Sequence, residues 1–269
     1  MISIGTTFNY EIPLEQQLPL IKNAGFSHIS LGARTEHSGY LSSSGQRAIK
    51  KLVETNDLAV CSIHTPFGKG IDVSSPRAEM RTQTLATYQE CIDAASALGS
   101  SIVIFHPTAH MQFDNLGDRK MAILDNVNEL LGYAGVKEVR LAIENDCLAP
   151  ANEILSHSLN EITDTRYGFC YDSSHDNLTA QPLKLLRDHG HRLLTTHISD
   201  NQGEKDDHML PYEGSFVWDD FCRVFAGINF RGIFLLEVEM RESAFKSVEA
   251  FLSEAFRRGQ ALRDRCTRT

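Results

Sequence analysis

Short apolar runs alternate with longer amphipathic stretches along most of this 269-residue chain. Eight of the runs are rich in Val, Ile, Leu or Phe and show little alternation with polar residues. Such near-continuous runs are typical of strands in a parallel sheet whose two faces are both covered. We therefore predict eight strands, at residues 2–8, 28–31, 58–64, 101–106, 139–145, 167–171, 192–197 and 232–238.

Helical periodicity fills the intervals between these runs, because apolar residues recur there every three or four positions. One predicted helix spans residues 76–98, with Pro76 near its start and Gly99 just past its end. Two further stretches, 153–159 and 183–186, are shorter and less regular. The periodic positions of the other predicted helices are Leu14, Leu18 and Ile21; Ala48, Leu52 and Val53; Ile123, Val127, Leu130 and Leu131; and Phe245, Val248, Phe251, Leu252, Ala255 and Phe256.

Eightfold alternation of strand and helix favours a closed (β/α)8 barrel, the TIM barrel, which commonly spans about 250 residues. We predict one such α/β domain over residues 1–269, because no Pro-, Gly- or Ser-rich linker divides the chain. An open, doubly wound parallel sheet is the structural alternative. No GxGxxG motif follows the first predicted strand, so the dinucleotide-binding form of that sheet has no support.

The composition of the chain indicates which classes of partner and which cell compartment to expect. The formal net charge of −9 argues against electrostatic attraction to nucleic acid or to an anionic membrane. The N-terminus lacks the features of a targeting signal, and no stretch approaches the ~20 apolar residues of a membrane helix. We therefore expect a soluble, cytoplasmic protein that does not associate with membranes, and we predict no particular oligomeric state.

The cysteines are scattered along the chain and form no CxxC pair. Several of them lie in apolar runs, which is typical of buried, reduced thiols rather than of a cysteine zinc site. We expect that reduced state for Cys61, Cys91, Cys147, Cys170, Cys222 and Cys266.

Polar side chains gather where the predicted strands end. The carboxyl ends of parallel strands meet at one rim of a barrel, where loops build active sites. A glutamate that closes an apolar strand is costly unless it is paired or binds a metal, and a divalent cation would remove the repulsion between two such glutamates. The rim residues that predict a metal centre are His64, His106, Glu144, His175, His197, His208 and Glu237. Structural roles are expected for His28, His37, His110, His157, His189 and His191.

Three motifs make the chain resemble a known family. Asp172-x-x-His175 follows the sixth predicted strand, and His197-Ile-Ser-Asp-Asn ends the seventh. The third motif is Asp206-Asp207-His208 followed by Pro211-Tyr212-Glu213-Gly214 and Trp218. In their order and spacing these motifs resemble the xylose isomerase-like TIM-barrel superfamily, which includes sugar phosphate isomerases and epimerases and the endonuclease IV group. The resemblance covers nearly the whole chain.

The resemblance implies two sets of metal ligands. In the epimerases one catalytic metal is held at positions that match Glu144, Asp172, His197 and Glu237, and the two glutamates are also the acid/base pair. In endonuclease IV three zinc ions are held by nine residues. The positions that match those nine are His64, His106, Glu144, Asp172, His175, His197, Asp206, His208 and Glu237. The assignment of Asp206 could shift by one position to Asp207.

Our first hypothesis is the isomerisation or epimerisation of a sugar, a sugar phosphate or a related hydroxy-ketone. A divalent metal would hold the carbonyl and a neighbouring hydroxyl and stabilise the enediolate that forms when a proton leaves the adjacent carbon. Glu144 and Glu237 would remove and return that proton, while His64, His106 and His175 would contact the substrate. Carboxylates suit Mn or Mg and imidazoles suit Zn, so we expect one to three ions of Zn or Mn, with Mg or Co as alternatives.

The alternative hypothesis is an endonuclease IV-like, zinc-dependent hydrolysis of phosphodiesters in abasic DNA. The nine matching residues permit it, but no stripe of Lys and Arg with interleaved aromatics marks a DNA groove. The loop at 32–44 contains Arg34 and Tyr40 but no basic run. We therefore prefer the sugar hypothesis, in which the partner is a small sugar-like molecule, and nucleic acid stays the partner in the alternative. A third class, a barrel that binds a metal without turnover, is disfavoured because both glutamates are present.

Overall fold

Eight parallel strands form a barrel in the computed structural model, which describes residues 1–68, 70–109, 115–241 and 243–267. The strand order is β7-β6-β5-β4-β3-β2-β1-β8, so strands that are neighbours in space are also neighbours in the sequence, except that β1 pairs with β8. The strands are β1 (Ile2–Gly5), β2 (His28–Leu31), β3 (Ala59–His64), β4 (Ile102–Phe105), β5 (Arg140–Glu144), β6 (Tyr167–Asp172), β7 (Leu193–His197) and β8 (Phe234–Leu236).

The barrel closes where β7 meets β8. The amide of Ile198 donates to the carbonyl of Leu235 at 2.9 Å, and the amide of Glu237 donates to the carbonyl of Ile198 at 3.2 Å. Ile198 and Glu237 directly follow His197 and Leu236, the last residues of the two strands. Closure therefore brings His197 and Glu237 to the same rim.

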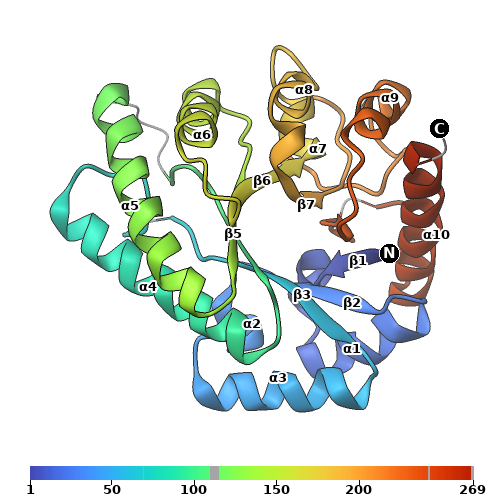
Figure 1. Cartoon of the computed structure of the whole chain (residues 1–269). Helices are drawn as coiled ribbons and strands as arrows, with labels where there is room; N and C mark the ends of the chain where they lie inside the picture. Colours follow the sequence, from blue (N-terminus) through green and yellow to red (C-terminus); the bar gives the residue numbers. More distant parts are fainter. Residues whose placement is uncertain (69, 110–114, 242, 268–269) are drawn as a thin grey trace.

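Helices surround the strands on the outside of the barrel (Figure 1). The long helices cover the sheet, while α2, α7 and the two 3-10 turns are short segments in the loops. The helices are α1 (Leu14–Asn23), α2 (Thr35–Ser38), α3 (Ser43–Thr55), α4 (Ala78–Ala97), α5 (Leu116–Val136), α6 (Ala149–Glu161), α7 (Ser173–Asn177), α8 (Lys184–His189), α9 (Trp218–Ile228) and α10 (Val248–Thr267), with 3-10 turns η1 (Thr6–Asn9) and η2 (Gly190–Arg192).

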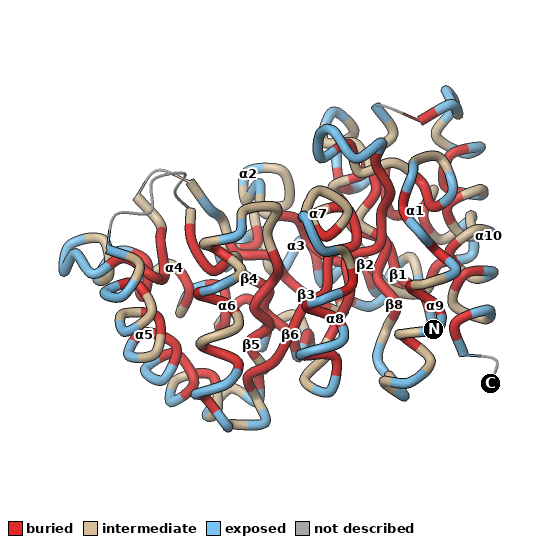
Figure 2. The backbone as a smooth tube through the Cα atoms, turned by 90° about the horizontal axis from the view of Figure 1, so that it is seen from above, coloured by how far each residue is buried: buried red, intermediate tan, exposed pale blue. Residues whose placement is uncertain are grey.

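The apolar core has two parts. The larger part lies between the sheet and the helices and includes Phe105, Tyr167 and Phe251, which are fully buried. A smaller cluster is built from alternate positions of β4, such as Ile102 and Ile104, together with residues of β5, β6 and β8. Both faces of the strands are thus covered, which explains their continuous apolar sequences. Figure 2 shows the buried strands at the centre and the exposed segments on the periphery.

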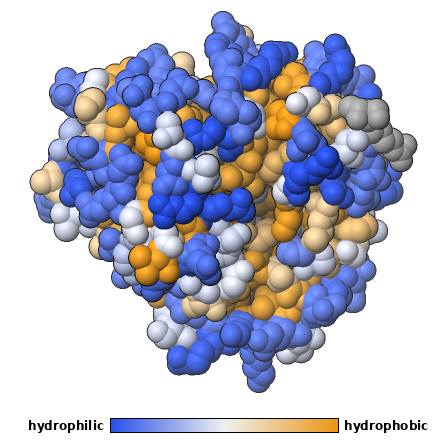
Figure 3. All heavy atoms as spheres, viewed as in Figure 1, coloured by the Kyte–Doolittle hydropathy of each residue, from blue (hydrophilic) through white to orange (hydrophobic). Residues whose placement is uncertain are grey.

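The predicted fold class and the predicted strands are confirmed. The first strand is shorter than predicted, because the chain turns into η1 after Gly5 and no longer pairs with β2. The eighth strand is also shorter, since only Phe234–Leu236 of the predicted 232–238 pair with β1. The sequence analysis did not predict α2, α7 or α9, and His110 lies outside the described residues. None of the helices in the described part combines the length and the apolarity that a bilayer crossing requires. The face of the molecule in Figure 3 is largely hydrophilic, and hydrophobic residues show between the hydrophilic ones.

The expectation of six reduced thiols is wrong for two of them. Cys222 in α9 and Cys266 in α10 form a disulfide, although 44 positions separate them in the sequence. The two helices pack side by side on the outside of the barrel, which brings these buried side chains together. Cys61, Cys91, Cys147 and Cys170 remain free thiols.

Candidate metal centre

The deepest part of the rim contains three carboxylates around one imidazole. Glu144, Asp172 and His197 are the last residues of β5, β6 and β7, and Glu237 directly follows β8. His197 Nδ1 lies 2.8 Å from Glu144 Oε1, 2.9 Å from Glu237 Oε2 and 3.9 Å from Asp172 Oδ2. One ligand atom from each of the four residues lies within 4.8 Å of the others. They are the four residues at which the family resemblance implies a single catalytic metal.

One oxygen of this group lacks a hydrogen-bond donor among the described residues. Asp172 is fully buried, and its Oδ2 has no hydrogen-bond partner in the described part of the chain. A buried carboxylate oxygen without a donor carries a large desolvation penalty. Burial accordingly raises the pKa of Asp172 to about 7, against the opposing charge of His175. A divalent cation among these donors would satisfy the oxygen, so the residues fit a metal.

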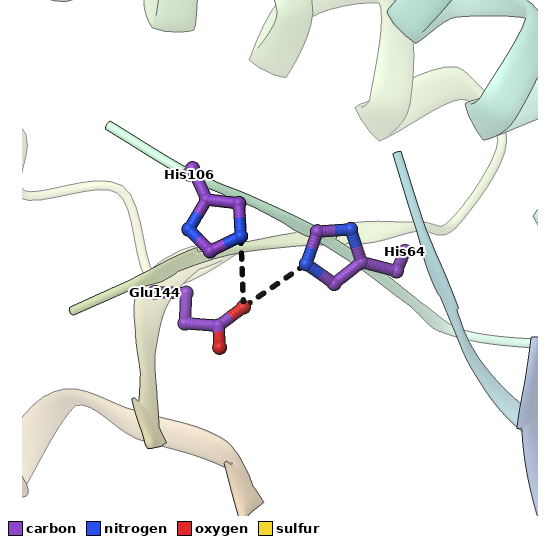
Figure 4. Close-up of side chains that lie close together, drawn as sticks. All are labelled: His64, His106 and Glu144. Atoms are coloured by element: carbon purple, nitrogen blue, oxygen red, sulfur yellow. Dashed lines mark hydrogen bonds and ion pairs between the residues drawn. The ribbon is translucent and has the colours of Figure 1, made fainter. Parts of the chain in front are cut away.

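A second group of possible ligands shares Glu144 with the first. His64 Nε2 lies 3.0 Å and His106 Nε2 lies 4.0 Å from Glu144 Oε2, and Figure 4 shows both rings directed at this oxygen. His64 Nδ1 lies 2.7 Å from the carbonyl of Thr65, which fixes the orientation of its ring. Burial lowers the pKa of His106 to about 4. The neutral imidazole that a metal requires is therefore the stable form of His106.

The third group lies at the mouth of the barrel. Asp206 Oδ2 is 3.2 Å from His175 Nε2 and 2.9 Å from His208 Nε2. The Nδ1 atom of each imidazole faces a backbone carbonyl, that of Asn145 for His175 at 2.8 Å and that of Glu237 for His208 at 3.1 Å. Burial lowers the pKa of His208, but the neighbouring Asp206 outweighs it and brings the value to about 10. The negative charge of Asp206 is thus compensated by a protonated His208.

Asp206 and Asp207, between which the sequence left the ligand assignment open, have different surroundings in the structure. Asp206 faces the histidines of the third group, whereas Asp207 Oδ1 pairs with Lys205 Nζ at 2.7 Å. All nine residues that match the endonuclease IV ligands therefore lie in three adjoining groups, with Glu144 common to two of them.

Asp200 fixes the loop that carries Asp206 and His208. Its carboxylate is fully buried and accepts four hydrogen bonds, two at each oxygen. The donors are the amides of Asn201, Tyr212 and Phe216 and the indole Nε1 of Trp218, at 2.9–3.0 Å. The backbone of Asp200 also exchanges two hydrogen bonds with Met209. The sequence analysis missed this role, although Asp200 stands in the His197-Ile-Ser-Asp-Asn motif.

The three groups face a cavity of about 210 Å³. Its wall includes side chains that the sequence analysis did not assign to the site, namely Thr7, Tyr10, Arg34 and Phe67. Phe67 is 58% exposed, and its ring lies 4.9 Å from that of His106, measured between centroids. These residues come from loops after β1, β2 and β3, where no periodic pattern reveals which side chains face inward.

We predict that Asp200→Asn destabilises the protein by about 1.5–3 kcal/mol, because the amide group would face two N–H donors and the charge-assisted bonds would be lost. Thermal and denaturant unfolding of the purified variant would measure the change. Asp219→Asn is the matched control: Asp219 pairs with Arg265 on the surface with a 71% exposed side chain, so we expect a change within about 0.5 kcal/mol. Equal stability of the two variants would contradict the role of Asp200.

Comparison with known proteins identifies the family of the chain. A family model described as the xylose isomerase-like TIM barrel matches residues 18–259. An uncharacterised protein of Sinorhizobium fredii, y4fM, is 27% identical, covering 82% of this chain and 80% of the relative. Fructoselysine 3-epimerase of Shigella flexneri is 22% identical, covering 87% and 88%.

The fold also matches solved structures. A structure of the IolI protein with a bound zinc atom superimposes with a TM-score of 0.82 at 16% identity, covering 99% of this chain and 98% of that one. At this identity the similarity concerns the fold, and the bound zinc is a property of that protein. Together with the family match over residues 18–259, these findings confirm the resemblance. The chain belongs to the xylose isomerase-like TIM-barrel family.

Proposed function

We propose that this protein is a divalent-metal-dependent epimerase or isomerase of a sugar, sugar phosphate or related hydroxy-ketone. The observation that carries the proposal is the pair of glutamates around one histidine nitrogen: Glu144 and Glu237 both lie within 2.9 Å of His197 Nδ1. Two neighbouring carboxylates suit the removal and return of a proton. The Asp172 oxygen beside them, which has no hydrogen-bond donor among the described residues, suits a bound cation. The similarity to a fructoselysine 3-epimerase supports the same class of reaction.

Glu144, Asp172, His197 and Glu237 would hold the ion. Their oxygen and nitrogen donors suit Zn or Mn, with Mg or Co as alternatives. When bound there, the ion supplies Lewis-acid polarisation of a substrate carbonyl and the hydroxyl next to it. Asp172 and His197 are almost fully buried beneath the cavity, so their task is to hold the ion rather than to exchange protons with the substrate.

Glu144 and Glu237 move the proton. One carboxylate takes the proton from the carbon next to the substrate carbonyl, and the other returns a proton to the opposite face, which inverts the configuration. The side chain of Glu237 is 16% exposed and that of Glu144 is 1% exposed, and both border the cavity. His64 Nε2 lies 3.0 Å from Glu144 Oε2 and thereby helps to orient that carboxylate.

The cavity favours a small substrate. Its volume of about 210 Å³ lies below the ~300–1,000 Å³ that is typical of sites for drug-sized ligands. His175, at the mouth, would contact a substrate hydroxyl, while His64, His106 and Phe67 border the reacting end of the cavity. Exclusion of bulk water by these rings would protect an enediolate from side reactions.

A second candidate function is the hydrolysis of phosphodiesters at abasic sites in DNA. The observation that favours it is the presence of three ligand groups, since one cation at the first group would leave the others without a metal. A cluster of ions suits phosphoryl transfer. Cleavage of an oligonucleotide with an abasic site, abolished by a chelator, would favour this function over the first.

We predict that the purified protein, after loading with Zn or Mn and removal of excess ions, retains at least one ion per chain by inductively coupled plasma mass spectrometry. Asp172→Asn should weaken the affinity for the metal by about 10- to 1,000-fold, because a charged ligand is lost from a buried site. Asp219→Asn, with its carboxylate on the surface, should bind as the wild type does. Retention of no ion by the wild type would contradict the metal-dependent proposal.

Each of the variants Glu144→Gln and Glu237→Gln should lower turnover by at least about 100-fold, because an amide cannot transfer the proton. The measurement is the incorporation of deuterium from D2O into the carbon next to the carbonyl, followed by NMR with D-fructose, D-tagatose and fructoselysine. Circular dichroism and metal content would show that the variants are folded and loaded. Glu129→Gln provides the control, since Glu129 pairs with Arg81 on the surface. Near-full exchange in either rim variant would show that the acid/base assignment is wrong.

A further inference from the structure

A groove of about 420 Å³ adjoins the cavity at the metal centre. It lies between η1, the segment after β2 and the segment after β8. The groove and the cavity share four wall residues, which are Thr7, Tyr10, Arg34 and Glu239. A molecule bound at the metal centre therefore has room to extend past Tyr10 into the groove. The two spaces together suit a substrate longer than a bare monosaccharide.

Among the described residues that line the groove, basic side chains outnumber acidic ones by three to two, although the chain as a whole has a net charge of −9. The basic ones are Arg34, Arg241 and Lys246, and the acidic ones are Glu11 and Glu239. Glu239 lies 3.5 Å from Arg241, so this acid already has a cationic partner. Lys246 is exposed, and its Nζ donates to the backbone carbonyl of Ser243 at 2.8 Å.

Arg34 is positioned at the junction of the groove and the cavity. Its guanidinium carbon lies 4.5 Å from the centroid of the Tyr10 ring, in a cation–π contact. Among the acids of the described residues, none forms an ion pair with Arg34. The Tyr10 ring is itself fixed by an edge contact with His37 at 5.2 Å. Stacking restrains the plane of the guanidinium while its N–H groups stay available, which is the arrangement that recognises carboxylate or phosphate.

We propose that this groove binds the anionic end group of the substrate, a carboxylate or a phosphate ester, with Arg34 as the main contact and Lys246 as a second one. The inference rests on the proposed function, because the other end of the same molecule is the hydroxy-ketone that reacts between Glu144 and Glu237. Arg34 thus determines specificity for an anionic sugar derivative over a neutral one.

The test compares three probes on the metal-loaded full chain: D-fructose, D-fructose 6-phosphate and D-fructuronate. Isothermal titration calorimetry should show that at least one anionic probe binds at least about tenfold more tightly than D-fructose. Arg34→Gln should weaken binding of that probe by about 10- to 100-fold, as expected for the loss of a charge-assisted hydrogen bond. The affinity of Arg34→Lys for that probe should lie between those of the wild type and of Arg34→Gln. Arg47→Gln, an exposed position on α3, is the matched control and should leave the affinity unchanged.

The outcomes separate this inference from the proposed function. A preference for the phosphate or for the carboxylate alone would support the groove and identify its anion. Anion binding that is unaffected in Arg34→Gln would overturn the inference, because the metal centre would then be the site of binding. Lack of any preference for an anionic probe over D-fructose would also overturn it. Deuterium exchange is measured on the same samples: Arg34-dependent binding without exchange contradicts the proposed function alone.

Discussion

Acidic side chains that share a buried space repel one another unless positive charge lies among them. Glu144, Asp172 and Glu237 meet around a single imidazole, and Asp206 lies among two more at the mouth of the barrel. The Oδ2 atom of Asp172 accepts no hydrogen bond from the described residues. A bound cation would satisfy these carboxylates together, and for that reason the metal is the centre of the functional proposal.

The barrel positions these groups with little freedom. Parallel strands fix the Cα atoms of Glu144, Asp172 and His197 at adjacent strand ends, and closure between β7 and β8 adds Glu237. Asp206 and His208 lie instead on a loop, and a loop needs a separate restraint to hold ligands in place. The four hydrogen bonds to the carboxylate of Asp200 provide that restraint.

Much of this arrangement was predictable from the sequence, because strands in a covered parallel sheet have a clear apolar signal and their polar ends stand out. Glu144 and Glu237 are examples, since each closes or follows an apolar run. Tyr10 and Arg34 could not be predicted in the same way, because loop side chains have no periodicity that tells which of them faces the cavity. Nor does spacing reveal the pairing of Cys222 with Cys266, which depends on how α9 and α10 pack.

A crystal structure of the metal-loaded protein with an anomalous difference map tests the central claim most directly. The account predicts a peak bonded to Glu144, Asp172, His197 and Glu237, at ligand distances of about 2.0–2.2 Å for Zn. Additional peaks at the two histidine groups would be compatible with this centre and would indicate a site for two or three ions. A map without a peak at the four residues, or with Glu144 and Glu237 turned away from a common ion, would contradict the account.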